Sequence, residues 1–115
     1  PMDYGIFVAL GSDILPTGPF QGLHSSVTRM GKTGRIFGPG ERLSMEEAVI
    51  GYTRNGAFLT FEENMKGTLE AGMLADFVIL SQDIFTVPAE AIRETAVEQT
   101  YIGGKLVYDV SKSEL

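Results

Sequence analysis

Cysteine is absent from the sequence, and histidine occurs only once, as His24. Without cysteine there are no disulfide bonds and no thiolate metal ligands, which suits a reducing, cytoplasmic environment. A lone histidine does not build a zinc centre of the usual kind, which takes several nitrogen, sulfur or oxygen ligands from the protein. We therefore expect His24 to pack or to form hydrogen bonds rather than to bind metal.

Long apolar runs and clusters of positive charge are also missing. No run approaches the roughly 18 apolar residues that a transmembrane helix needs, so we expect no membrane partner. Lys and Arg number 9 against 15 Asp and Glu, and the net charge is −6. Phosphate backbones bind clustered Lys and Arg, so nucleic acid is not expected as a partner. No basic segment followed by an apolar one opens the chain, and we expect a cytoplasmic protein without a signal peptide.

The composition, 43% hydrophobic and 21% charged, suits an ordinary soluble domain. Two units are predicted: a strand, loop and helix of an α/β protein in residues 1–61, and a small β unit in residues 62–115. The chain starts with Pro1 and enters an apolar run within a few residues. Because natural domains usually begin with a polar lead-in, we expect a piece of a longer protein.

In the first unit, residues 6–10 read as a buried strand and residues 23–30 as a short helix, each followed by a loop rich in glycine and proline. Ser44 and Glu47 form a capping box, in which the Ser44 hydroxyl accepts from the Glu47 N–H and the Glu47 carboxylate accepts from the Ser44 N–H. The box predicts a helix that starts at Ser44 and ends at about Phe61.

The second unit has the signals of short strands. The run Phe77–Leu80 is rich in β-forming residues and predicts a strand. Pro88 can open a helical turn through Ile92. The pair Gly103-Gly104 accepts the positive φ of a two-residue turn, so a hairpin is predicted from residues 97–102 and 105–109.

Asp13 is the candidate site residue. It ends the triplet Gly11-Ser12-Asp13, directly after the apolar run of residues 6–10. Barrel enzymes place catalytic carboxylates at the carboxyl ends of their strands, which favours a functional role. An aspartate after a strand also caps the following loop as an Asx turn, and both interpretations are open from the triplet alone.

Other candidate motifs have structural explanations. The glycine-rich segment 31–40 lacks the GxxxxGK[ST] spacing of a phosphate-binding loop. The acid pairs Glu46-Glu47 and Glu62-Glu63 suit helix ends and solvated surfaces. There is no cysteine nucleophile and no GxSxG elbow. The residues by themselves form no complete catalytic constellation.

The order of several segments nevertheless resembles a known family. They are Gly11-Ser12-Asp13, Pro19 to Arg29, Glu41 to Ala48, Lys66 to Leu80 and Ile102 to Tyr108. Together they resemble the C-terminal part of a metal-dependent hydrolase of the amidohydrolase superfamily, in the branch called amidohydrolase family 3. The segment from Lys66 to Leu80, followed by the Gly-Gly hairpin, carries the superfamily resemblance.

The resemblance implies a fold. Such enzymes are (β/α)8 TIM barrels with a small composite β-sandwich built from both ends of the chain. Residues 6–10 would be the last barrel strand, the helix from Ser44 a late barrel helix, and residues 62–115 the C-terminal share of the sandwich. A barrel takes roughly 250 residues, so this chain would be only its C-terminal piece.

The resemblance also implies chemistry. These enzymes hold divalent metal, here expected to be zinc, through histidines and an acid, and hydrolyse carbon–nitrogen bonds of small molecules with metal-activated water. Asp13 matches the family's acid, a metal ligand and general base. The family's His-x-His pair has no counterpart, and His24 matches none of the histidines. The fragment alone is therefore expected to bind no metal and to be inactive.

An alternative is a non-catalytic, β-rich assembly or interaction domain that kept the scaffold and lost the site. A small binding module unrelated to the family is a third possibility, but it would make the shared motif order a coincidence. If the chain is a piece of the larger hydrolase, the apolar faces of residues 6–10 and of the helix from Ser44 would be left uncovered by the missing barrel elements. Exposed apolar area and unpaired strand edges drive association, so we expect the chain to self-associate as an oligomer.

Overall fold

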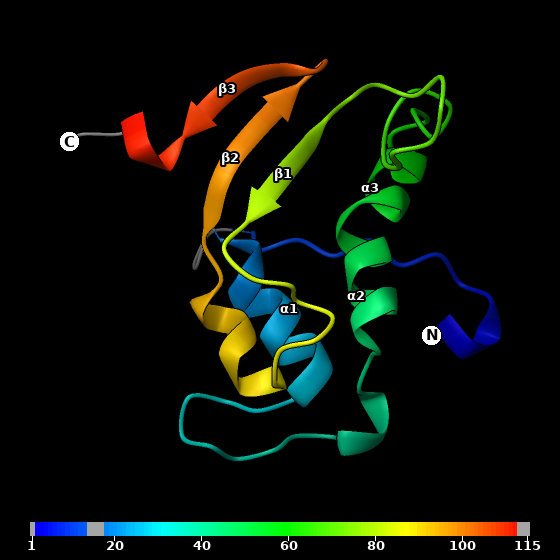
Figure 1. Ribbon diagram of the computed structural model, residues 1–115. Coiled ribbons are helices and arrows are strands. Elements are labelled where there is room, and N and C mark those ends of the chain that lie inside the picture. Colours follow the sequence, from blue (N-terminus) through cyan, green and yellow to red (C-terminus); the bar gives the residue numbers. More distant parts are fainter. Residues whose placement is uncertain (1, 14–17, 113–115) are drawn as a thin grey trace.

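The structure is a computed structural model that describes residues 2–13 and 18–112 (Figure 1). The α-helices are α1 (Pro19–Thr28), α2 (Met45–Tyr52) and α3 (Arg54–Leu59). The strands are β1 (Phe77–Leu80), β2 (Val97–Ile102) and β3 (Lys105–Asp109). Short 3-10 helices are η1 (Met2–Tyr4), η2 (Pro39–Glu41), η3 (Ala89–Glu94) and η4 (Val110–Lys112). Among the described residues, no helix combines the length and the apolar character that crossing a membrane would take.

The capping box at Ser44 is confirmed. Glu47 N donates to Ser44 Oγ at 3.1 Å, and Ser44 N donates to the Glu47 carboxylate at 2.8 Å. The prediction of one continuous helix to residue 61 is wrong, because Thr53 has φ −123° and ψ −85° and separates α2 from α3. The Thr53 hydroxyl donates to Val49 O at 2.8 Å, a side-chain bond to the preceding turn of the kind that bends helices.

The short helix predicted at residues 23–30 is present but displaced. α1 starts at Pro19, since proline is favoured in the first turn of a helix, where its missing N–H costs nothing. It ends at Thr28, because Arg29 has a left-handed φ of 57° and its N–H donates to Ser25 O.

The strand predicted at residues 6–10 is not formed within this chain. This segment is extended, but none of the described strands pairs with it, and a ladder needs a neighbouring strand. Helices take that place instead: Leu10 N donates to Gly51 O at 2.9 Å, and the Asn55 side-chain amide donates to Val8 O at 2.9 Å.

The strands form an antiparallel sheet in the order β1-β2-β3. The strand at Phe77–Leu80 and the hairpin of β2 and β3 are confirmed. Gly103 and Gly104 have φ values of 57° and 76°, as a two-residue hairpin turn of type I′ requires. Asp76 fixes this turn to the start of β1, because its carboxylate accepts from Gly103 N at 2.7 Å.

The main core joins the two predicted units. Leu23 of α1 and Ala48 of α2 pack with Ile84, which follows β1, and with Ile92 of η3. All four are buried. The partly buried residues around them are Phe20, Val27, Leu43, Met45, Val49, Tyr52, Leu80, Val87 and Ala89. Residues 1–61 and 62–115 therefore bury their apolar side chains against each other.

The end of α3 gives a first testable prediction. Phe61 follows the helix with a left-handed φ of 61°, its side chain is 91% exposed, and Glu62 N donates to Ala57 O across the turn. Glycine is the favoured residue at this position. Phe61→Gly should therefore raise the free energy of unfolding by about 0.5–1 kcal/mol, measured by urea denaturation. Phe61→Ala, which keeps a Cβ, is the control, and a decrease in Phe61→Gly would contradict the prediction.

Candidate functional site

Asp13 lies at the end of the extended segment, as its place in the sequence suggested. It is exposed and has a left-handed φ of 53°, a conformation in which aspartate is enriched among the residues other than glycine. The preceding Ser12 hydroxyl donates to Gly18 O at 3.3 Å. This bond joins the two ends of the loop between Asp13 and α1, of which residues 14–17 lie outside the described part of the chain.

Three contacts fix the segment that leads to Asp13 along the helix pair α2–α3. The Phe7 and Phe58 rings stack with centroids 4.4 Å apart, and the bonds from Asn55 to Val8 and from Leu10 to Gly51 follow. As the residue number increases along the segment, the residue number of its contact in the helices decreases. The segment and the helix pair therefore run in opposite directions.

Gly51 lets the segment and α2 come close together. A Cβ at this position would stand 2.9 Å from the Leu10 side chain, closer than carbon atoms pack. The glycine that weakens the helix by propensity is therefore needed where the segment is held. As a result, the backbone leading to Asp13 is placed by packing and by hydrogen bonds.

A small cavity lined by polar side chains and glycines lies beside this segment. Its volume is about 210 Å³, and it is lined by Gly11, Ser12, Gln21, Gly22, Ser25 and Tyr52. The Tyr52 hydroxyl approaches Gly22 so closely that any Cβ there would overlap it. Hydroxyl and amide groups from α1 and α2 thus surround a hollow next to the candidate acid. They can donate and accept hydrogen bonds to a polar group of a small molecule.

A metal site cannot be completed from the residues that the structure describes. Among them, no three His, Cys, Asp or Glu side chains gather in a way that could hold an ion. Asp13 is the one predicted ligand, and a single carboxylate does not match the donor sets of divalent metals in proteins. The residues present do not fit a metal centre by themselves.

His24 is buried on α1, so its expected packing role is confirmed. It is 3% exposed, and its Nδ1 atom has no hydrogen-bond partner among the described residues. Burial lowers the pKa of the imidazole below its usual value, and the positive charge of Arg93 lowers it further, while Glu90 acts in the opposite direction. Its charged neighbours Arg93 and Glu90 lie on η3, and His24 does not line the cavity beside Asp13.

A larger, mostly apolar cavity of about 690 Å³ lies between the helix pair α2–α3 and the region of β1. Its walls come from Val49, Thr53, Ala57, Lys66, Gly67, Thr68, Leu69, Asp76, Phe77, Val78, Leu80, Gln82, Asp83, Ile84 and Phe85. Sequence reasoning missed this cavity because its walls belong to segments far apart in the chain.

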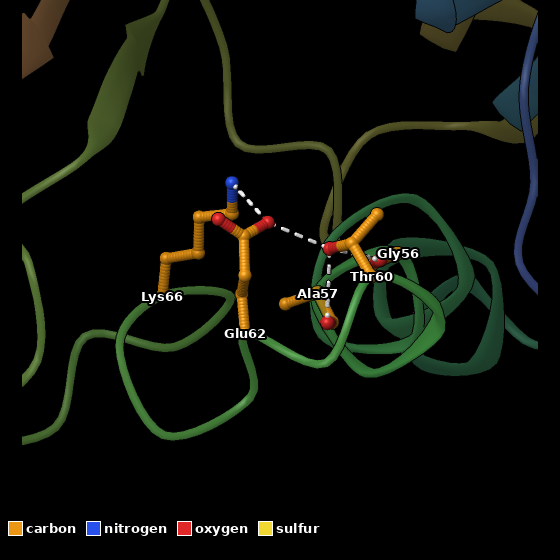
Figure 2. Close-up of polar contacts among 5 residues, drawn as sticks. All are labelled: Gly56, Ala57, Thr60, Glu62 and Lys66. Atoms are coloured by element: carbon orange, nitrogen blue, oxygen red, sulfur yellow. Dashed lines mark hydrogen bonds and ion pairs between the residues drawn. The ribbon is translucent and has the colours of Figure 1, made fainter.

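The acid pair Glu62-Glu63 was expected to lie on a solvated surface, but Glu62 also forms specific contacts there. Figure 2 shows Glu62 between Lys66 and Thr60. The Glu62 Oε2 atom lies 2.7 Å from the Lys66 Nζ atom and accepts a hydrogen bond of 2.7 Å from the Thr60 hydroxyl. The hydrogen bond from Lys66, and then the one from Thr60, lower the pKa of the Glu62 carboxyl below its usual value near 4.5. The carboxylate is thus stabilised in its charged form.

This cluster gives a second prediction. Because the pKa of Glu62 is lower in the folded than in the unfolded chain, its stabilising effect is present above pH 4.5 and is lost as the pH falls through the folded value. The free energy of unfolding, measured from pH 6 to pH 3, should therefore fall less steeply in Lys66→Met than in the wild type. Lys105→Met, at an exposed lysine, should keep the wild-type slope. Equal slopes in all three proteins would contradict the prediction.

A family profile and several known proteins match this sequence over most of its length. Residues 2–108 match the sequence profile described as the amidohydrolase family. A Bacillus subtilis protein named as an amidohydrolase, YtcJ, is 33% identical over 112 residues, which cover 93% of this chain and 21% of that protein. The N-substituted formamide deformylase of Arthrobacter pascens is 32% identical over 111 residues, covering 94% of this chain and 20% of the enzyme.

A solved structure has a similar fold. The crystal structure of an amidohydrolase from Thermotoga maritima aligns with a TM-score of 0.66 at 22% identity. The alignment covers 94% of this chain and 24% of the other. The chain spans about a fifth of the length of the two curated relatives above.

Proposed function

Because the chain belongs to the amidohydrolase family, we propose that it is the C-terminal part of a hydrolase that cleaves carbon–nitrogen bonds in small, amide-like molecules. The observation that carries this proposal is the position of Asp13, at the end of a segment held along α2–α3. The similarity to an enzyme named as a formamide deformylase supports the same class of bond. We place this hydrolase in the cytoplasm.

The proposed architecture is a piece of a (β/α)8 barrel joined to part of a β-sandwich. The segment of residues 6–10 and the helices α2–α3 run in opposite directions, as a strand and its returning helix do in a βα unit. Residues 62–115 would supply the sheet β1-β2-β3 to the sandwich. Residues 6–10 would then pair with neighbouring barrel strands of the longer protein.

In this proposal the Asp13 carboxylate is the general base. It takes a proton from the attacking water as the new carbon–oxygen bond forms, and it returns that proton to the nitrogen as the carbon–nitrogen bond breaks. The proton count is balanced over the reaction, and Asp13 ends as a carboxylate. Its exposed position at the end of an anchored segment suits such a transfer.

We further propose that the complete hydrolase depends on a divalent metal, with zinc as the expected ion. Asp13 would be one ligand, and the others would come from outside this sequence, because the described residues do not complete a set. The 115-residue chain alone would then hold no metal and have no activity.

The first experiment is to measure the mass of the native protein in its source cells with an antibody raised against this chain. A species several times heavier than 12.5 kDa, which contains metal and hydrolyses amide substrates after purification, is the expected result. A species of 12.5 kDa, or a heavy one without hydrolase activity, would overturn the proposal. The assembly-domain alternative would then become the leading one.

We propose, as a separate matter, that the isolated 115-residue chain self-associates. Large apolar side chains are strongly exposed, among them Phe61, Leu69, Leu59, Phe7 and Phe85. Apolar surface of this kind drives association in water. Light scattering at high protein concentration should show an oligomer, and a monomer would contradict the proposal.

A further inference from the structure

The 3-10 helix η3 is the joint between the sheet and the α-helices. It packs along α1, with Ile92 buried next to Leu23, and Figure 1 shows the two helices side by side. The Gln82 side-chain amide donates to Ala91 O and to Thr95 Oγ1, both at 2.8 Å. These bonds tie η3 to the segment after β1, and β2 begins shortly after η3 ends. We therefore expect η3 and the sheet to move together relative to the α-helices.

His24 lies in this joint with an unsatisfied ring nitrogen. The side chain is 3% exposed, and Nδ1 has no hydrogen-bond partner among the described residues. A neutral imidazole has one N–H donor and one acceptor nitrogen, whereas the cation has two donors. Protonation would therefore place a positive charge, with one N–H group unpaired, inside the joint. Burying an unpaired charged group is costly, so the docked joint selects neutral His24.

We propose that His24 is a pH-sensitive latch: the neutral side chain lets η3 dock on α1, and protonation releases η3 and the attached sheet from the α-helices. This inference does not depend on the proposed hydrolase function, because it uses no residue of the candidate site.

Charged side chains on the elements packed against α1 affect the protonation of His24. The elements packed on α1 carry Glu90, Arg93 and Glu94 on η3, and Glu46 and Glu47 on α2. Burial and Arg93 lower the pKa of His24, and Glu90 partly opposes them. Glu47 is engaged in the capping box with Ser44.

The direction of the pH effect follows. In the released state His24 binds its proton near pH 6.5, whereas in the docked state it does so only at lower pH. Docking should therefore be fully stable above pH 6.5 and should weaken as the pH falls below that value. The loss is up to about tenfold in the docking equilibrium per pH unit, until the docked imidazole itself is protonated.

Amide hydrogen exchange measured by NMR tests the latch on the 115-residue chain. The N–H of Thr95, which donates to Ile92 O, reports on η3, and the N–H of Ala48, which donates to Ser44 O, is the internal control in α2. Between pH 7.5 and pH 5, protection at Thr95 should fall relative to Ala48 in the wild type. In His24→Gln, which stays neutral, the ratio should stay constant. A constant ratio in the wild type, or an equal fall in His24→Gln, would overturn the latch.

Two charge variants keep the proposal testable even if His24→Gln does not fold. Removing the positive charge in Arg93→Gln should reduce the loss of protection at pH 5. Removing the negative charge in Glu90→Gln should increase it. Because the chain has a single histidine, its one imidazole NMR signal gives the protonation state in each variant. Shifts of the same sign in both variants would overturn the proposal.

Discussion

Replacing Asp13 with asparagine is expected to lower the turnover of the complete hydrolase by about 10²–10⁴-fold, the usual contribution of a general base. The asparagine amide cannot accept a proton from water at neutral pH, although it has nearly the same shape as the acid. The fold should be unaffected, because Asp13 is exposed and asparagine tolerates the left-handed backbone with φ 53°.

The measurement is kcat and KM on amide and formamide substrates for the wild type, Asp13→Asn and Asp3→Asn. Asp3 lies in η1, is also exposed and undergoes the same chemical change, so Asp3→Asn should retain wild-type turnover. Thermal unfolding should be the same in all three proteins. Undiminished turnover in Asp13→Asn would remove Asp13 from the proposed mechanism.

Truncating Ile92 to alanine should cause the largest loss of stability, about 2–5 kcal/mol in the free energy of unfolding. The side chain is 1% exposed and packs with Leu23, Ala48 and Ile84 in the core between the two units. The substitution removes apolar contacts and leaves a cavity among elements that cannot easily close it. Domains are stable by only about 5–15 kcal/mol, so a loss of this size is a large fraction of the total.

Urea denaturation followed by circular dichroism measures this loss. Ile102→Ala is the matched control, because Ile102 is 59% exposed at the end of β2 and should lose less than about 1 kcal/mol. Equal losses in the two variants would show that the Ile92 side chain is not central to the core.

The elements that the sequence predicted well are those whose signals are local. Ser44 and Glu47 satisfy each other's backbone N–H groups within one turn, and the hairpin depends on two glycines that accept positive φ. Neither device needs a distant part of the chain. Their residue types were therefore sufficient to locate the start of α2 and the turn between β2 and β3.

The failures concern elements that depend on neighbours. The apolar run of residues 6–10 predicted a strand, but a strand is completed by another strand, and here Gly51 O and the Asn55 side chain provide the partners. The break at Thr53 coincides with a side-chain hydrogen bond to Val49 O, of a kind that bends helices. The capping box at Ser44 marks where the helix begins but carries no information about this break.

The surroundings of Asp13 show the same limit. Its position after the apolar run was visible in the sequence, whereas the cavity beside it was not. Gln21 and Ser25 come from α1 and Tyr52 comes from α2, and no fixed spacing connects them. The close approach of Tyr52 to Gly22 is a constraint that only the folded chain reveals.

The shared core also sets an order of events during folding. The hairpin of β2 and β3 is made of neighbouring residues and can form early, whereas the burial of Leu23 by Ile92 closes a loop that includes most of the chain. During synthesis α1 and α2 are made first, and their apolar sides stay uncovered until η3 has been added. That interval is when the nascent chain is most exposed to aggregation and to chaperones. Substitutions that slow the docking of η3 should therefore reduce the yield of folded protein, even where the free energy of unfolding of the final protein changes little.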